Sequence, residues 1–127
     1  MKPAFAPAIP VRFVFVLLPL LGCGGPRLAD PDLARATLTQ VLDAWRDGRS
    51  LNDMATGSPA ITVSDPAWKA GFKLSRYEVA KSARAVGFDL KIPVELWLLD
   101  LKGRPVQEKA RYVVSVEPSR TVIRAPF

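Results

Sequence analysis

The chain has 127 residues, which is the size of one ordinary domain rather than two. It carries 18 basic and 12 acidic residues, a formal net charge of +6, and the two signs alternate without a block of like charge. It contains no histidine and one cysteine, so the commonest general base, the commonest metal ligand and an internal disulfide bond are excluded. We therefore expect no metal site and no cofactor.

The N-terminus has the layout of an export signal. Lys2 and Arg12 precede an apolar run at 13–21, and the first acidic residue is Asp30. The run is about half as long as the roughly 20 residues that a transmembrane helix needs. These features predict a signal peptide at residues 1–22 rather than a permanent membrane span.

The cysteine directly follows this run. Leu20, Leu21 and Gly22 precede Cys23, and this sequence resembles the lipobox of bacterial lipoproteins. The resemblance implies cleavage between Gly22 and Cys23 and attachment of diacylglycerol to the sulfur of Cys23, often followed by N-acylation. The alternatives are an ordinary cleaved secretory signal, an uncleaved anchor, or a small buried cysteine.

A lipid on Cys23 implies a protein of the cell envelope that is anchored to a membrane and faces the periplasm. Residues 23–29 then form a short tether that spans at most about 3.5 Å per residue. Loss of Lys2 and Arg12 lowers the formal net charge from +6 to +4, and nucleic acid is not an expected partner of an exported protein. Gly24, the next residue, leaves the choice between inner and outer membrane open.

An amphipathic helix is predicted over residues 31–47. Asp30 is a favoured N-cap residue, Pro31 suits the first helical position, and Gly48 suits the end of the helix. Apolar side chains recur on one face with a period of 3.6 residues, at Ala34, Leu38, Val41, Leu42 and Trp45. That face must pack against another apolar surface.

Short elements are predicted in the middle of the chain. Ser50 and Asp53 have the spacing of a capping box at the start of a one-turn helix. A strand follows at 61–63. Asp65 before a proline repeats the cap arrangement of the first helix, and this turn should carry Trp68 onto the body of the domain.

The C-terminal half is predicted to form a sheet. Alternation over 88–98 indicates a strand with one face in the core, and Pro93 within it indicates an edge or a bulge. A glycine turn at 101–104 and further alternation at 110–116 predict an antiparallel hairpin. The core positions of the first strand are Phe88, Leu90, Ile92, Val94, Leu96 and Leu98.

Two further strands complete the predicted sheet. The strand at 72–79 changes parity at Ser75 and Arg76, as a β-bulge would produce, and a last strand is predicted at 121–124. Residues 30–127 are therefore predicted to form a single α+β domain, with one long amphipathic N-terminal helix packed on a curved antiparallel sheet.

This order of elements resembles the cystatin-like and NTF2-like folds, and more specifically small uncharacterised exported lipoproteins. The resemblance covers residues 31–125 and includes no diagnostic motif. It implies a sheet that wraps around the helix. NTF2-like proteins include isomerases and dehydratases with acid or base residues in a conical pocket, and many proteins that only bind or scaffold.

An isomerase-like site would have to use carboxylates and tyrosines, because histidine is absent and Cys23 is expected to carry lipid. Asp89 and Glu95 hold polar positions of their strand, where solvated surface charge is the ordinary interpretation. Tyr77 and Tyr112 hold apolar positions that are typical of core residues. We therefore expect no catalytic residue among the candidates Asp65, Asp89, Glu95, Asp100, Tyr77 and Tyr112.

A candidate interaction surface lies on the outer face of the predicted sheet. Trp97 and Leu99 share this face, and Val113 is expected opposite Trp97 on the next strand. Since one helix covers only one face of a sheet, this patch would be free to bind a second copy or an envelope protein. Alternatively, the N-terminal segment or the stretch at 51–68 covers it.

The leading hypothesis is a membrane-anchored envelope lipoprotein whose domain is a non-catalytic binding or scaffolding module. The alternative is a small-ligand-binding pocket protein or an isomerase-like enzyme of the NTF2-like type. A wide cavity between helix and sheet that contains an acidic residue would favour the alternative.

Overall fold

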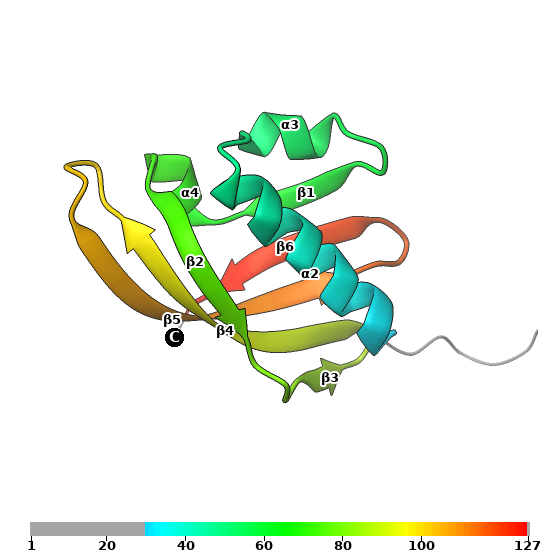
Figure 1. The fold of residues 1–127 in the computed structure, drawn as a ribbon. Coiled ribbons are helices and arrows are strands. Elements are labelled where there is room, and N and C mark those ends of the chain that lie inside the picture. Colours follow the sequence, from blue (N-terminus) through cyan, green and yellow to red (C-terminus); the bar gives the residue numbers. More distant parts are fainter. Residues whose placement is uncertain (1–29, 127) are drawn as a thin grey trace, which may run out of the picture.

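The structure is a computed structural model that describes residues 30–126. It is α+β, with a curled sheet that is mostly antiparallel and a few helices (Figure 1). The expected signal peptide at 1–22 and tether at 23–29, with Cys23, lie outside the described residues. The elements are α2 (Pro31–Arg46), α3 (Leu51–Ala55), β1 (Ile61–Ser64), α4 (Pro66–Ala70), β2 (Lys73–Val79), β3 (Arg84–Val86), β4 (Asp89–Leu99), β5 (Pro105–Ser115) and β6 (Arg120–Ala125).

Helix α2 begins where its cap residues predict. The carboxylate of Asp30 accepts a hydrogen bond from the Leu33 N–H at 3.1 Å, and Pro31 occupies the first turn. The helix has 16 residues and is about 24 Å long, so the expected long helix is not confirmed. No helix within residues 30–126 is long and apolar enough to span a membrane.

The two predicted short helices are present with their caps. Asp53 N–H donates to the Ser50 hydroxyl at 3.0 Å, and Ser50 N–H donates to the Asp53 carboxylate at 2.9 Å, which completes the capping box of α3. The Asp65 carboxylate caps α4 by accepting the Ala67 N–H at 3.0 Å. Both helices are therefore fixed by local side-chain chemistry.

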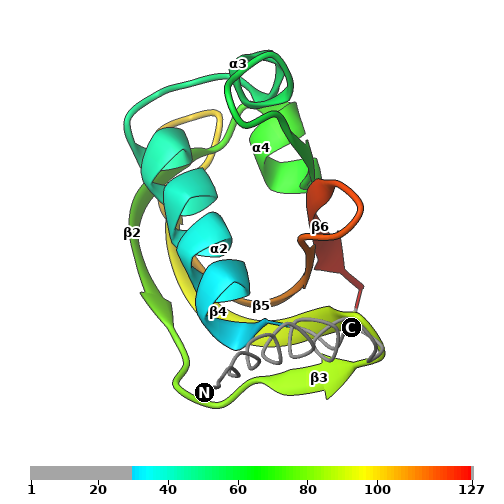
Figure 2. The same cartoon turned by 90° about the vertical axis from the view of Figure 1, so that its right-hand side faces the viewer.

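The described sheet has six strands in the order β1-β6-β5-β4-β2, and β3 pairs with the start of β4. All pairs are antiparallel except β1 with β6, which is parallel. Figure 2 shows the sheet curling around α2, with β2 on one side of the helix and β6 on the other. The purely antiparallel sheet that the sequence predicts is thus wrong at one edge.

The core lies inside this curl. Residues at even positions of β4 are buried, as alternation predicts, from Leu90 to Leu98. Phe88 is an exception, with 56% of its surface exposed. Because β4 begins at Asp89, Phe88 belongs to the turn after β3, and strand parity does not apply to it.

Two irregular positions of the sheet follow their predictions. The pairing of β2 with β4 shifts register between Leu74 and Arg76, which confirms the expected bulge. Pro93 lies in β4 between two pairing partners. The strand β3 pairs with residues 89–91 of β4, and β2 pairs with residues 94–99. The carbonyl of Pro93 accepts the Ala80 N–H at 2.9 Å, and its missing N–H falls in the gap between the two partners, where no strand would accept it.

Candidate functional site

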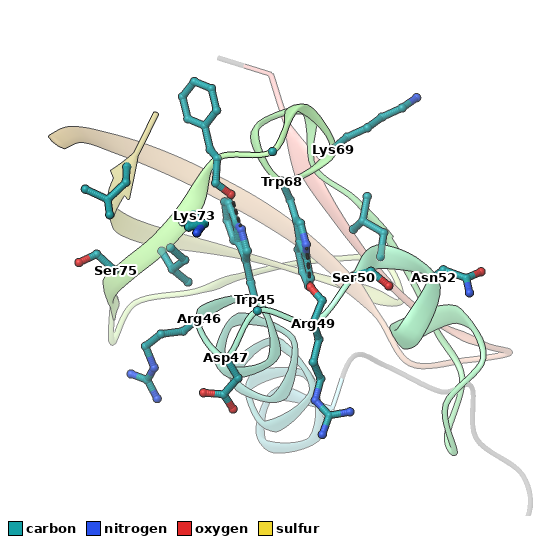
Figure 3. A pocket seen from close by; sticks show the side chains of 16 residues that line it. Trp45, Arg46, Asp47, Arg49, Ser50, Asn52, Trp68, Lys69, Lys73 and Ser75 are labelled. Carbon is teal, nitrogen blue, oxygen red and sulfur yellow. Dashed lines mark hydrogen bonds between the residues drawn. The ribbon is translucent and has the colours of Figure 1, made fainter. Parts of the chain in front are cut away.

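A groove of about 730 Å³ lies at the C-terminal end of α2 (Figure 3). Its walls come from the end of α2, the start of α3, the end of α4 and the start of β2, and Leu99 of β4 contributes to one side. Its size is within the range of ligand-binding pockets. Three separate helices and the sheet therefore meet around one concave surface.

Two stacked tryptophans form the floor of the groove. The rings of Trp45 and Trp68 lie 5.2 Å apart between centroids and are almost parallel, at 2°. The indole N–H of Trp45 donates to the carbonyl of Phe72 at 2.9 Å, and that of Trp68 donates to the carbonyl of Arg49 at 3.1 Å. Both rings are buried, so they give the groove a rigid apolar base.

The chain positions Trp68 by means of a sharply ended helix. The helix α4 stops at Gly71, whose φ of 103° is a left-handed conformation that favours glycine. A Cβ at this glycine would also stand 3.0 Å from the side chain of Leu101. Gly71 thus returns the chain from Trp68 into β2 at the edge of the groove.

The rim of the groove is basic. Arg46, Arg49, Lys69 and Lys73 are exposed around it, and Asp47 is the one acidic residue among its lining residues. The side chains of the two lysines form no hydrogen bond or ion pair with any residue of 30–126. Arg46, in contrast, forms an ion pair with Asp43 at 3.0 Å. The groove therefore combines an apolar floor with the positive charge of two lysine side chains that no acidic side chain of 30–126 pairs with.

A second polar cluster lies inside the curl of the sheet. The carboxylate of Asp65, buried at 3% exposure, accepts the hydroxyl of Tyr112 at 2.5 Å and the guanidinium of Arg124 at 3.3 Å. Arg124 also binds Glu108. Together with the two backbone N–H groups of α4, Asp65 accepts four hydrogen bonds, three on Oδ1 and that of Tyr112 on Oδ2, so the buried carboxylate is engaged by partners within the domain.

The tyrosines are held in their neutral form. Burial, followed by the charge and hydrogen bond of Asp65, raises the pKa of Tyr112 far above its ordinary value. Burial and the hydrogen bond to Asp43, at 2.6 Å, raise the pKa of Tyr77 to about 12. Both hydroxyl groups act as donors to a carboxylate, and neither can serve as a base near neutral pH.

The structure does not bring the candidate acid and base residues together. Only Asp65 and Tyr112 form a pair. Asp89 and Glu95 lie on the outer face of β4, and Asp100 accepts the backbone N–H groups of Lys102 and Arg104 in the β4–β5 turn. Residues 30–126 contain no group of three His, Cys, Asp or Glu side chains that could hold a metal ion.

The residues of the expected outer patch share a face, but Val113 does not adjoin Trp97 and Leu99. Trp97 pairs with Gln107, whereas Val113 pairs with Lys91, six positions along β4. The expectation that Val113 lies opposite Trp97 is therefore wrong, because the register of β4 and β5 places Gln107 there. The guanidinium of Arg76 covers the Trp97 ring, 3.9 Å from its centroid, and Leu99 lines the groove instead.

Sequence reasoning assigned Trp45 and Trp68 to packing and did not identify the basic rim. No local pattern could have found the rim, because its cations come from α2, α4, β2 and the loop after α2. The arrangement is suited to holding an anionic group next to an apolar one. Comparison of the chain with protein-family models, curated proteins and solved structures finds no match.

Proposed function

We propose that the chain is an envelope lipoprotein, anchored to a membrane through Cys23, whose domain is a non-catalytic binding module. The single observation that carries the binding role is the groove with its tryptophan floor and basic rim. The groove adjoins the C-terminal end of α2, whereas a tether from Cys23 would join the N-terminal end, about 24 Å away. An anchored domain would thus hold the groove away from the bilayer.

The ligand that fits this groove is an extended acidic peptide segment with an apolar side chain. The cations at the rim complement acidic residues, and the half-buried side chains of Leu51 and Phe72 offer apolar contacts beside the indole floor. In addition, β2 is an end strand of the described sheet, and Lys73 to Ser75 line the groove. An extended peptide could pair with the free edge of this strand.

The cystatin-like and NTF2-like folds are the proposed relatives of this architecture. A mostly antiparallel sheet curled around a helix supports the proposal, while the parallel pairing of β1 with β6 is a departure from a simple meander. In NTF2-like enzymes the acid or base would lie in the pocket between helix and sheet. Here the buried Asp65 is engaged by Tyr112 and Arg124 within the domain and does not line the groove, which favours binding over catalysis.

The anchor is tested at Cys23. Cys23→Ser should abolish acyl labelling and release the chain from the membrane fraction, because the thioether to the lipid can no longer form. Gly25→Ser, a small change two residues away, should leave labelling and membrane attachment unchanged. A Cys23→Ser chain that stays in the membrane fraction at the same apparent mass as the wild type would show that the lipoprotein assignment is wrong.

The groove is tested with the pair Lys69→Gln and Lys73→Gln. The probe is a labelled short peptide in which a phenylalanine stands between glutamates, and binding is measured by fluorescence polarisation. Loss of two exposed charges should weaken binding about tenfold, and the effect should shrink at high salt. The pair Lys81→Gln and Lys109→Gln removes two exposed charges that do not line the groove and should have little effect.

Two results would contradict this ligand class. If both pairs of substitutions weaken binding equally, the peptide responds to net charge and not to the groove. If the peptide fails to bind but dodecanoate below its micelle concentration binds and quenches tryptophan fluorescence, the small-ligand pocket protein is the better description.

A further inference from the structure

Three of the four exposed large apolar side chains of residues 30–126 lie toward the end of the domain opposite the groove. Among the described residues the exposed large hydrophobics are Val86 (48%), Phe88 (56%), Ile123 (44%) and Leu101 (69%). Val86 and Phe88 flank the turn between β3 and β4, with Gly87 between them at a φ of 64°. We call Val86 and Phe88 the hairpin tip.

Ile123 lies on the outer face of the sheet near this tip. The register places Arg84, Lys91, Val113 and Ile123 in one row across β3, β4, β5 and β6. Val113 of the predicted outer patch therefore belongs to this end of the molecule. Leu101, in contrast, lies in the β4–β5 turn at the other end (Figure 1).

The loop that leads from β2 into β3 is held at the N-terminal end of α2. The guanidinium of Arg35, in the second turn of the helix, donates to the carbonyl of Ala80 at 2.8 Å and to the carbonyl of Lys81. Figures 1 and 2 both show β3 at the end of the domain where α2 begins. The tip and the point where the tether would enter thus face the same side.

Positive charge lies at the base of the β3–β4 hairpin. A hollow of about 240 Å³ at this base is lined by Arg84, Lys91 and Arg111, together with residues of the loop before β3. Arg84 and Lys91 stand directly opposite each other across the strand pair, an arrangement of like charges that destabilises a sheet. A bound anion would relieve this repulsion. Asp89 is the one acidic residue of the hairpin.

We propose that the β3–β4 hairpin docks on an anionic membrane surface, with Val86 and Phe88 in the lipid interface and phospholipid phosphate at the hollow of Arg84, Lys91 and Arg111. The inference rests on the proposed anchor for its geometry: seven residues from Cys23 to Asp30 allow at most about 25 Å between the lipid and α2. An apolar tip within that reach, flanked by cations, has the composition of an interfacial membrane contact.

The test uses the full chain with a photoreactive phenylalanine analogue at position 88 or, as the control, at position 101. Both positions are exposed and apolar, but they lie at opposite ends. After illumination of intact cells, mass spectrometry should find phospholipid adducts at position 88 and few at position 101. Arg84→Gln together with Lys91→Gln should lower the adduct yield at position 88 at least about fivefold.

The inference and the proposed anchor can fail separately. If the chain fractionates with membranes through Cys23 but position 88 yields no lipid adduct, the hairpin inference fails and the anchor stands. Adducts of position 88 with residues 1–29, with a second copy or with another protein would identify a different occupant and overturn it. Equal lipid adducts at positions 88 and 101 would also overturn it. A chain that is soluble and forms no lipid adduct would remove the anchor itself.

Discussion

Replacing Asp65 with alanine is expected to destabilise the domain by about 3–5 kcal/mol. The change leaves the hydroxyl of Tyr112 without its acceptor and the guanidinium of Arg124 with Glu108 alone, in a site where the Asp65 side chain is 1% and the Arg124 side chain 13% exposed. It also removes the cap of α4 and loosens the helix that carries Trp68 into the groove. Denaturant unfolding measures the loss, and peptide binding should weaken in parallel.

Asp30→Ala is the matched control for this change. Asp30 is also an N-cap residue followed by proline, but it is exposed and takes no part in a buried network. Its loss should cost about 1 kcal/mol, the usual value of a cap. A double-mutant cycle of Asp65→Ala with Tyr112→Phe should give a coupling of about 1–3 kcal/mol. Equal effects of Asp30→Ala and Asp65→Ala would show that Asp65 acts only as a cap.

The elements that were predicted correctly are those whose ends are defined by neighbouring residues. The caps at Asp30, Ser50 and Asp65 each place a helix within a residue of its observed start. Alternation located β4 and β5, because one face of each strand is buried against α2. Neighbouring residues were therefore sufficient to predict the helix starts and the strands whose one face is buried.

The features that sequence reasoning missed depend on contacts between distant segments. β1 pairs in parallel with β6, the last strand, and no local sequence pattern in either strand indicates that the two strands pair. The short strand β3 was missed, because its three residues are all exposed and show no alternation of burial. Phe88 was wrongly assigned to the core, because β4 begins at Asp89, one residue later than the alternation of apolar residues suggests, and Phe88 lies in the turn with Gly87.

The groove illustrates the same limit for the candidate site. Trp45 and Trp68 were recognised as packing residues, and they are buried, but their stacking against each other follows from the way α4 folds back over the end of α2. The basic rim exists because the fold brings Lys69 and Lys73 to the same groove as Arg46. A site assembled from separate elements has no spacing in the sequence by which to find it.

Replacing Leu42 with aspartate is expected to prevent folding. Leu42 is 1% exposed on the face of α2 that the sheet surrounds, and it has no polar partner for a carboxylate. Burial of an unpaired charge in this position should cost more than about 4 kcal/mol, which approaches the whole stability of a domain of this size. Circular dichroism and denaturant unfolding should show loss of the cooperative transition.

Gln40→Asp supplies the control, because it introduces the same residue into the same helix at an exposed position. The change in helix propensity and in net charge is similar, so its cost should stay within about 0.5 kcal/mol and the cooperative transition should remain. The contrast isolates burial as the cause. If Leu42→Asp unfolds at the wild-type midpoint, the apolar face of α2 does not pack inside the curled sheet. The architecture that places the groove and the hairpin tip at opposite ends of α2 would then be incorrect.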